Sequence, residues 1–259
     1  MGALHEGHAS LVTRAKRETA AVGVSIFVNP LQFGSKSDLA AYPRTAMKDL
    51  DVLDSLNCDF VFTPSIEEMY PDFPELQKST VSVAGPALGF EGADRPGHFD
   101  GMATVVAKLF FLTGSCSAYF GEKDFQQLAV VRQMVRDLSM PVTVVGCPTI
   151  RETDGLALSS RNVRLSQEGR VAAGVLSTAL DAGVEAVAAA LAPAEVNEIM
   201  ASVVADEPLA TLHYAELVDA ASLTAPLSLV DGVAYRLLLA CSIDGVRLID
   251  NAHAEVGGI

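Results

Sequence analysis

The alternation of short apolar runs with longer amphipathic segments most constrains the fold of the N-terminal part of this chain. Residues 21–28 (AVGVSIFV) are almost continuously apolar, which is typical of a strand buried on both faces of a parallel sheet. Comparable runs predict further strands at 59–62, 79–83, 117–120 and 141–147. The segments between predict helices at 9–20, 46–56, 102–112 and 125–138. Because strands that alternate with helices pair in parallel, we expect an α/β fold with a Rossmann-like parallel sheet.

The pattern changes after residue 166. An Ala-rich segment predicts one long helix at 167–191, and a second helix is expected at 193–204. Strands are then expected at 211–218, 233–241 and 245–249. Helices followed by strands favour a separate, smaller α+β domain. We therefore expect two domains, 1–149 and 150–259, with the active site in the cleft between them and the second domain acting as a lid.

Composition narrows the classes of function. Half of the residues are hydrophobic, so the chain can bury a substantial core, but the net charge is −14 and the isoelectric point is near 4.7. A surface of this sign is unsuited to extended contact with nucleic acid. The apolar run 101–113 is short and contains Lys108, and the run 171–192 contains Asp181 and Glu185. Neither predicts a membrane span.

Two further observations concern location. The chain opens directly on a polar motif with no signal-peptide pattern, and we therefore expect a cytoplasmic protein with no membrane partner. Its cysteines, at positions 58, 116, 147 and 241, are scattered and form no CxxC pair. We interpret them as buried, reduced thiols.

The N-terminal stretch MGALHEGH contains the most distinctive chemistry. His5 and His8 are three residues apart, so a helix that begins here would place both rings on one face of its first turn. A helix N-terminus attracts anions, and two imidazoles beside it would suit a phosphate chain on which charge accumulates. A zinc site is an alternative, although helical zinc pairs are usually four residues apart. Two ordinary surface histidines are a further interpretation.

Polar side chains follow several of the predicted strands. In an open α/β sheet such positions line the ligand crevice. Each of these polar residues also has a simpler interpretation, as a turn residue, a helix cap or a solvent-exposed loop residue. The candidate binding residues are Asn29 and Gln32, Arg95 and His98, Lys123 with Gln127 at helical spacing, and Arg151, Ser159, Ser160 and Arg161.

The order of the motifs is more specific than any single motif. MGALHEGH, SIFVNPLQF, YPRT, RPGHFDG, YFGEKDFQQL and RETDGLALSSRN follow one another, with LIDN at 248–251. Together they are similar to the pantoate–β-alanine ligase (pantothenate synthetase) family, adenylate-forming enzymes with an HxGH signature. The resemblance extends over the whole chain.

This resemblance implies that ATP and pantoate form an enzyme-bound pantoyl adenylate, which β-alanine then attacks to give pantothenate and AMP. It implies Mg²⁺ bound mainly through the ATP phosphates, and a homodimer. His8 resembles the general acid, and His5, Lys123 and Arg161 would assist at the phosphates. The implied pantoate and β-alanine residues are Gln32 and Gln127, with Asn29, Arg95 and His98 as further contributors. The implied ATP site consists of Met1, Gly2, Ala3, Leu4, His5, Glu6, Gly7, His8, Gly121, Glu122, Lys123, Asp124, Ile150, Leu158, Ser159, Ser160 and Arg161.

The sequence departs from the family at two points, and it leaves several rival functions open. The family has a first strand before its Met-Gly, so we expect two strands to lack a neighbour and the His5 loop to lack an anchor. Leu158 stands where the family often has Met, a tolerable apolar exchange. A nucleotidylyltransferase that releases a dinucleotide would share HxGH, but it does not explain Gln32 and Gln127. The remaining rival functions are an inactive nucleotide-binding relative and a tRNA ligase.

Overall fold

The computed structural model describes residues 1–34, 39–40, 42–75 and 77–258. The Cα positions separate into two compact units. The N-terminal unit contains Met1–Glu122 and Gln126–Pro148, and the C-terminal unit contains Lys123–Phe125 and Thr149–Ile259. The short segment Lys123–Phe125 therefore belongs to the C-terminal unit although the chain on both sides of it belongs to the N-terminal unit.

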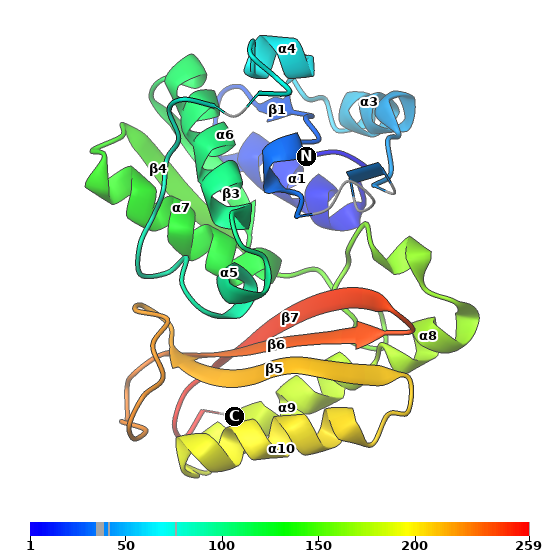
Figure 1. Cartoon of the computed structure of the whole chain (residues 1–259), viewed down its shortest axis with the longest axis vertical. Coiled ribbons are helices and arrows are strands. Elements are labelled where there is room, and N and C mark those ends of the chain that lie inside the picture. The colour runs from blue at the N-terminus through cyan, green and yellow to red at the C-terminus, as the bar shows by residue number, and fades with distance from the viewer. Residues whose placement is uncertain (35–38, 41, 76, 259) are drawn as a thin grey trace. The chain divides into compact units, whose positions relative to one another are not determined.

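Parallel strands and flanking helices build the N-terminal unit, as the apolar runs predict (Figure 1). Its strands are β1 (Gly23–Ser25), β2 (Phe60–Phe62), β3 (Cys116–Gly121) and β4 (Val142–Cys147). Its helices are α1 (Glu6–Glu18), α3 (Ala46–Ser55), α4 (Ile66–Met69), α5 (Phe90–Asp94), α6 (His98–Thr113) and α7 (Phe125–Asp137), with 3-10 turns η1 (Pro30–Gln32) and η2 (Glu122–Asp124). β1 pairs with β2 and β3 with β4, both in parallel, and no ladder joins the two pairs among the described strands.

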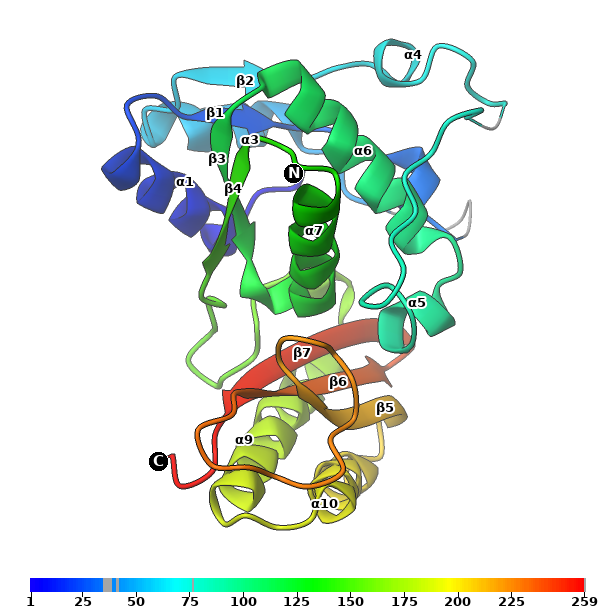
Figure 2. The same cartoon turned by 90° about the vertical axis from the view of Figure 1, so that its left-hand side faces the viewer.

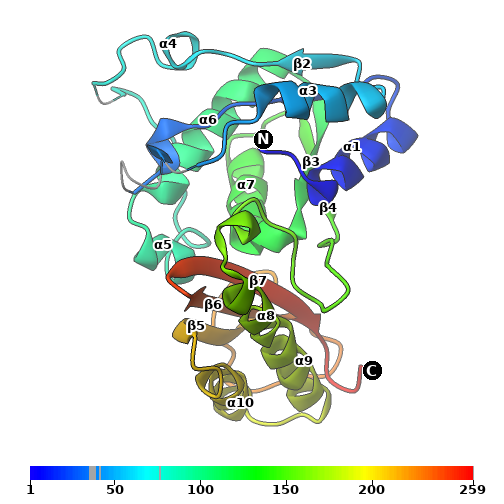
Figure 3. The same ribbon diagram turned by 90° about the vertical axis from the view of Figure 1, so that its right-hand side faces the viewer.

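Each strand pair has its own hydrophobic core. Helices α1 and α3 cover β1 through Val12 and Leu53, which share a core with Val24 of β1. Figure 3 shows α3 beside β2. The larger core joins α6 and α7, which lie beside β3 and β4 in Figure 2, to these two strands. Met102 and Val131 are buried in this core. This arrangement of helices around parallel strands confirms the predicted α/β class.

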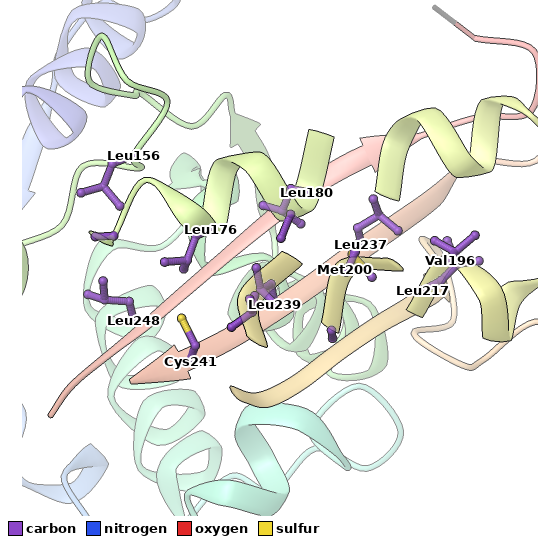
Figure 4. Packing of buried hydrophobic residues seen from close by; sticks show 14 of the residues in the cluster. Leu156, Leu176, Leu180, Val196, Met200, Leu217, Leu237, Leu239, Cys241 and Leu248 are labelled. Carbon is purple, nitrogen blue, oxygen red and sulfur yellow. The ribbon is translucent and has the colours of Figure 1, made fainter. Parts of the chain in front are cut away.

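The C-terminal unit is an antiparallel sheet covered by two helices. Its strands are β5 (Ala210–Asp219), β6 (Tyr235–Ile243) and β7 (Val246–Ala254), with β6 in the centre. Its helices are α8 (Gln167–Ala172), α9 (Val175–Ala188) and α10 (Pro193–Ala205), with a 3-10 turn η3 at Asn162–Arg164. Figure 4 shows side chains of α9 and α10 packed against alternate residues of β6, such as Leu237, Leu239 and Cys241.

Three expectations were wrong in detail. The predicted helix 167–191 is two helices, because the chain turns at Ala173 and Gly174 before α9 begins. The predicted strand 79–83 is irregular, since Val81 donates its backbone N–H to the Thr104 hydroxyl at 2.9 Å instead of to a strand. All four cysteines are free, but only Cys147 and Cys241 are buried.

The segment Gln167–Ala188 is long and apolar enough to cross a membrane on length and composition alone. It is divided by the turn at Ala173, and α9 contributes Leu176, Leu180 and Val187 to the core of the C-terminal unit. Core helices of globular domains share this composition.

Candidate active site

The His5–His8 pair lies where α1 begins. His5 is the N-cap residue in extended conformation, and its side chain accepts a hydrogen bond from the Gly7 N–H, a helical N–H that would otherwise lack a partner. The ring centroids of His5 and His8 are 4.1 Å apart. The spacing of three residues thus brings the imidazoles together, as we expect for one face of a helical turn.

The hydrogen bonds of the two rings indicate their tautomers. Nδ1 of His5 accepts from Gly7 N at 3.2 Å, and Nδ1 of His8 accepts from His5 N at 3.4 Å. A neutral imidazole whose Nδ1 accepts a hydrogen bond has its proton on Nε2. Each ring therefore has Nε2 as its donor atom, which is the arrangement required to donate to a phosphate oxygen.

An aspartate that the sequence analysis missed holds the loop before α1. Asp49 of α3 is 2% exposed, and its carboxylate accepts from Ala3 N at 2.9 Å and Leu4 N at 2.8 Å. Ala3 has a φ of 50°, a left-handed conformation that costs an L-residue about 1–2 kcal/mol. The two hydrogen bonds offset this cost. The expectation that the His5 loop lacks an anchor is therefore wrong, because α3 supplies one.

The loop start also contacts β1. The Met1 ammonium donates to the Ser25 carbonyl at 2.8 Å, and the Met1 carbonyl accepts from Phe27 N at 3.0 Å. The loop is thus fixed on one side by a helix side chain and on the other by strand backbone.

A second cluster surrounds Gln32 at the end of η1. Asn29 is 2% exposed, and its Nδ2 donates to Gln32 Oε1 at 3.1 Å and to the Gly101 carbonyl at 3.0 Å. Its Oδ1 accepts from Leu31 N and from the Tyr70 hydroxyl at 2.9 Å. Burial raises the pKa of Tyr70 far above its usual value, so this hydroxyl keeps its proton. Asn29 therefore orients the Gln32 side chain, and Tyr70 orients Asn29.

Arg95 and His98 contact the backbone of the same glutamine. His98 Nδ1 lies 2.8 Å from the Gln32 carbonyl oxygen, and Arg95 Nη2 donates to that oxygen at 3.3 Å. Because a carbonyl only accepts, His98 carries its proton on Nδ1, and its Nε2 can accept from Arg95 Nη1 at 3.3 Å. Glu91, 5% exposed, lies 3.6 Å from the same guanidinium. These contacts hold both side chains against the Gln32 backbone, and their expected role in substrate binding stays a prediction.

Lys123 and Gln127 are placed by the junction of β3 and α7. Gly121 ends β3, η2 contains Lys123, and Gln127 lies half-buried in the first turn of α7. Lys123 Nζ is 3.3 Å from an Asp124 oxygen, and the Lys123 side chain is 17% exposed. Gln126, the residue before Gln127, is not among the predicted site residues. It is buried, and its Nε2 donates to the carbonyls of Pro86, Leu88 and Gly89.

Residues 150–161 form a short hairpin followed by a turn. Arg151 and Ala157 form an antiparallel bridge, and Leu158 N donates to the Ile150 carbonyl at 2.9 Å. Arg161 N then donates to Ser159 Oγ at 3.2 Å. The sequence thus predicted the polar segment, but not that a hairpin brings Ile150 and Leu158 together.

Further contacts fix this hairpin. Arg151 forms a bidentate ion pair with Asp250 at 2.6 and 3.0 Å and donates to the Gly155 carbonyl at 2.8 Å. Arg170 binds Glu152 and Asp154, each at 2.6 Å. Within the described parts of the chain, no group of three or more His, Cys, Asp or Glu side chains could hold a metal ion.

Comparison with known proteins identifies the family. The family profile described as Pantoate-beta-alanine ligase matches residues 1–253. The pantothenate synthetase of Cereibacter sphaeroides (strain ATCC 17029 / ATH 2.4.9) is 52% identical over 252 residues, which cover 97% of this chain and 88% of that protein.

Solved structures agree in fold. The crystal structure of pantothenate synthetase from Thermus thermophilus superposes with a TM-score of 0.90 at 48% identity, over 97% of this chain and 90% of that one. The Francisella tularensis pantoate-beta-alanine ligase, complexed with beta-gamma ATP and beta-alanine, gives 0.77 at 36% identity, over 97% and 86%. This chain therefore belongs to the pantoate–β-alanine ligase family.

Proposed function

We propose that this ligase joins pantoate to β-alanine through a pantoyl adenylate, with His5 and His8 acting on the phosphates of ATP. The observation that carries the assignment is the His5–His8 pair at the start of α1, with ring centroids 4.1 Å apart and both Nδ1 atoms accepting backbone N–H groups. Two Nε2–H donors beside a helix N-terminus form a site complementary to a polyphosphate.

In the first step a pantoate carboxylate oxygen attacks the α-phosphorus of ATP. The bond to the bridging oxygen breaks, and its electron pair leaves with pyrophosphate. Negative charge develops on that leaving group, so donors placed before the reaction stabilise the transition state most. His8 donates a hydrogen bond from Nε2 to the leaving pyrophosphate, and its neutral ring keeps that proton, while His5 assists at the phosphates. In the second step the β-alanine amine attacks the acyl carbon, the acyl C–O bond breaks and its electron pair leaves with AMP, and solvent takes the proton that the amine loses.

Further residues extend this site. Lys123 supplies a point charge and Arg161 a planar set of donors for phosphate oxygens, and Ser159 and Ser160 add hydroxyls. Gln32 and Gln127 bind pantoate, because an amide both donates to a carboxylate and accepts from a hydroxyl. We further propose that the C-terminal unit acts as a lid.

Magnesium, cellular location and subunit association complete the proposal. Mg²⁺ usually takes one or two carboxylates together with substrate phosphates. We propose that Mg²⁺ binds here mainly through ATP, where it would neutralise phosphate charge. We propose a cytoplasmic homodimer, and sedimentation velocity at micromolar concentration would measure the association.

The test measures AMP release with ATP, Mg²⁺ and pantoate, with and without β-alanine. We expect AMP to appear only when β-alanine is present, whereas a nucleotidylyltransferase would release a dinucleotide and no AMP, with or without the amine. His8→Asn removes the Nε2 donor but keeps an acceptor near Nδ1, and it should lose about 100-fold in kcat/KM or more. His8→Gln keeps an amide N–H near Nε2 and should lose less. His253→Gln, at an exposed pair with Glu255, is the matched control. Unchanged activity of His8→Asn would contradict the assignment.

A further inference from the structure

A buried asparagine of the C-terminal unit contacts both segments to which we assign phosphate binding. Asn251 lies in β7 and is 3% exposed. Its Nδ2 donates to the Lys123 carbonyl at 2.8 Å, and its Oδ1 accepts from Arg236 Nε at 2.6 Å. Its own carbonyl accepts from Arg151 Nη2 at 3.1 Å. One residue therefore links η2 with the arginine that closes the 150–161 hairpin.

The partners of Asn251 determine how its amide is oriented. A guanidinium only donates and a backbone carbonyl only accepts, so Oδ1 must face Arg236 and Nδ2 must face Lys123. A carboxylate at this position could still accept from Arg236 but would place an acceptor against the Lys123 carbonyl. A residue with both functions on one short side chain is required to satisfy both neighbours.

Arg236 holds the other end of the same short segment. It is 7% exposed, and its guanidinium carbon lies 4.2 Å from the centroid of the Phe125 ring. A cation at this distance from an aromatic face is attracted to it. Asn251 thus contacts the backbone of Lys123, and Arg236 contacts the ring two residues later. These contacts explain why Lys123–Phe125 groups with the C-terminal unit.

Asp250, the residue before Asn251, fixes the hairpin. Its carboxylate is 1% exposed and forms the bidentate pair with Arg151, which in turn donates to the Gly155 carbonyl. Asp250 Oδ1 also accepts from Asn251 N at 2.7 Å. Two consecutive residues of β7 therefore set the backbone of Lys123 and that of the hairpin leading to Ser159–Arg161.

We propose that Asn251 is a positioning residue for the ATP site, acting through Lys123. By holding the Lys123 carbonyl, it fixes the backbone from which the ammonium reaches the phosphates. Displacements near 1 Å at a reacting centre can cost about 100-fold in rate, so anchoring the backbone has a measurable effect. The inference rests on the proposed function of Lys123.

The primary test is Asn251→Asp, which preserves size and the contact with Arg236 but removes the donor to Lys123. We expect kcat/KM for ATP to fall about tenfold while KM for β-alanine stays unchanged. A purely structural role would lower the amount of folded enzyme. The apparent kcat would then fall, while the KM for each substrate would stay the same. Asn197→Asp is the matched control, because Asn197 accepts from Leu217 N and donates to Glu216 in the same unit, apart from Lys123.

A double-mutant cycle decides whether the effect passes through Lys123. In a Lys123→Ala background we expect Asn251→Asp to cause no additional loss, since residues that act as one unit are not additive. Additive losses would overturn the inference while leaving Lys123 in its role. A normal ATP dependence of Lys123→Ala alone would overturn the proposed role of Lys123, and the inference with it.

Arg236→Lys provides an independent variant if Asn251→Asp lowers the unfolding temperature more than Asn197→Asp does. It retains the charge but loses the Nε donor to Asn251 and the planar group over Phe125. We expect the same signature, a selective fall in kcat/KM for ATP, at about threefold. An unchanged ATP dependence in a folded Arg236→Lys variant would contradict the proposal.

Discussion

Gly101 allows helix α6 to approach the loop that carries Gln32. A Cβ built at this glycine would lie 2.2 Å from the Leu31 carbonyl oxygen, 2.5 Å from its carbon and 2.9 Å from Gln32 N. All three are backbone atoms, so a rotamer change cannot relieve the overlap. Ordinary contacts begin near 3.5 Å, and Gly101→Ala therefore has to push the loop away by about 1 Å.

The displacement has two measurable consequences. Overpacking of this kind costs about 1–3 kcal/mol in the free energy of unfolding. It also shifts Gln32 and weakens the bond from Asn29 to the Gly101 carbonyl, now 3.0 Å. A shift of this size at a substrate-positioning residue costs up to about 100-fold in rate. We therefore expect kcat/KM for pantoate to fall about 10- to 100-fold, with KM for ATP nearly unchanged.

The assay is AMP release at varied pantoate, with urea unfolding of the same samples. Gly34→Ala is the matched control, because a Cβ there meets no atom of the described residues within 4 Å. Gln32→Ala sets the benchmark for losing the amide. If Gln32→Ala impairs pantoate use and Gly101→Ala stays within twofold of wild type, the steric argument is refuted. If neither Gln32→Ala nor Gly101→Ala changes kcat/KM for pantoate, the proposed role of Gln32 is wrong.

Two further predictions concern stability. Arg151→Met leaves the Asp250 carboxylate, which is 1% exposed, without its guanidinium partner. We expect the free energy of unfolding, measured with urea, to fall by about 3 kcal/mol. The loss should be smaller when Asp250→Asn is added. Burial raises the pKa of Glu216, partly opposed by the hydrogen bond from Asn197. The folded carboxyl therefore keeps its proton to higher pH than the unfolded one, and stability falls as pH rises through that raised pKa. Glu216→Gln should be more stable than wild type at pH 7 and equal to it below about pH 4, and equal stability at both pH values would contradict this account.

The sequence predicted features that depend on short spacings. Four residues of MGALHEGH sufficed to predict that the rings of His5 and His8 meet, because helical geometry fixes neighbours three residues apart. The apolar runs likewise located the parallel strands and the C-terminal antiparallel sheet. The order of the motifs identified the family without any structure.

The missed features depend on long-range contacts. Asp49 is an ordinary acidic residue of an amphipathic helix until the fold brings it to Ala3, and Tyr70 lies 41 residues from Asn29. Neither position has a local pattern that marks it. Likewise, Arg95 and His98 contact the Gln32 carbonyl across 63 and 66 residues of sequence, and their expected role in substrate binding stays a prediction. The turn at Ala173–Gly174 was missed because an Ala-rich run satisfies helix propensity on both sides.

The division of the parallel strands into two pairs has a consequence for local opening. β1 pairs with β2 over only three residues, whereas the central strand β6 is hydrogen-bonded on both sides over nine. Short ladders open by small fluctuations, so their amides exchange with solvent long before those of a central strand. The backbone amides of β1, whose Ser25 carbonyl accepts from Met1, are therefore among the first to exchange hydrogen for deuterium. A ligand bound at the His5 loop would be detected there as slowed exchange, at a distance from the atoms that react.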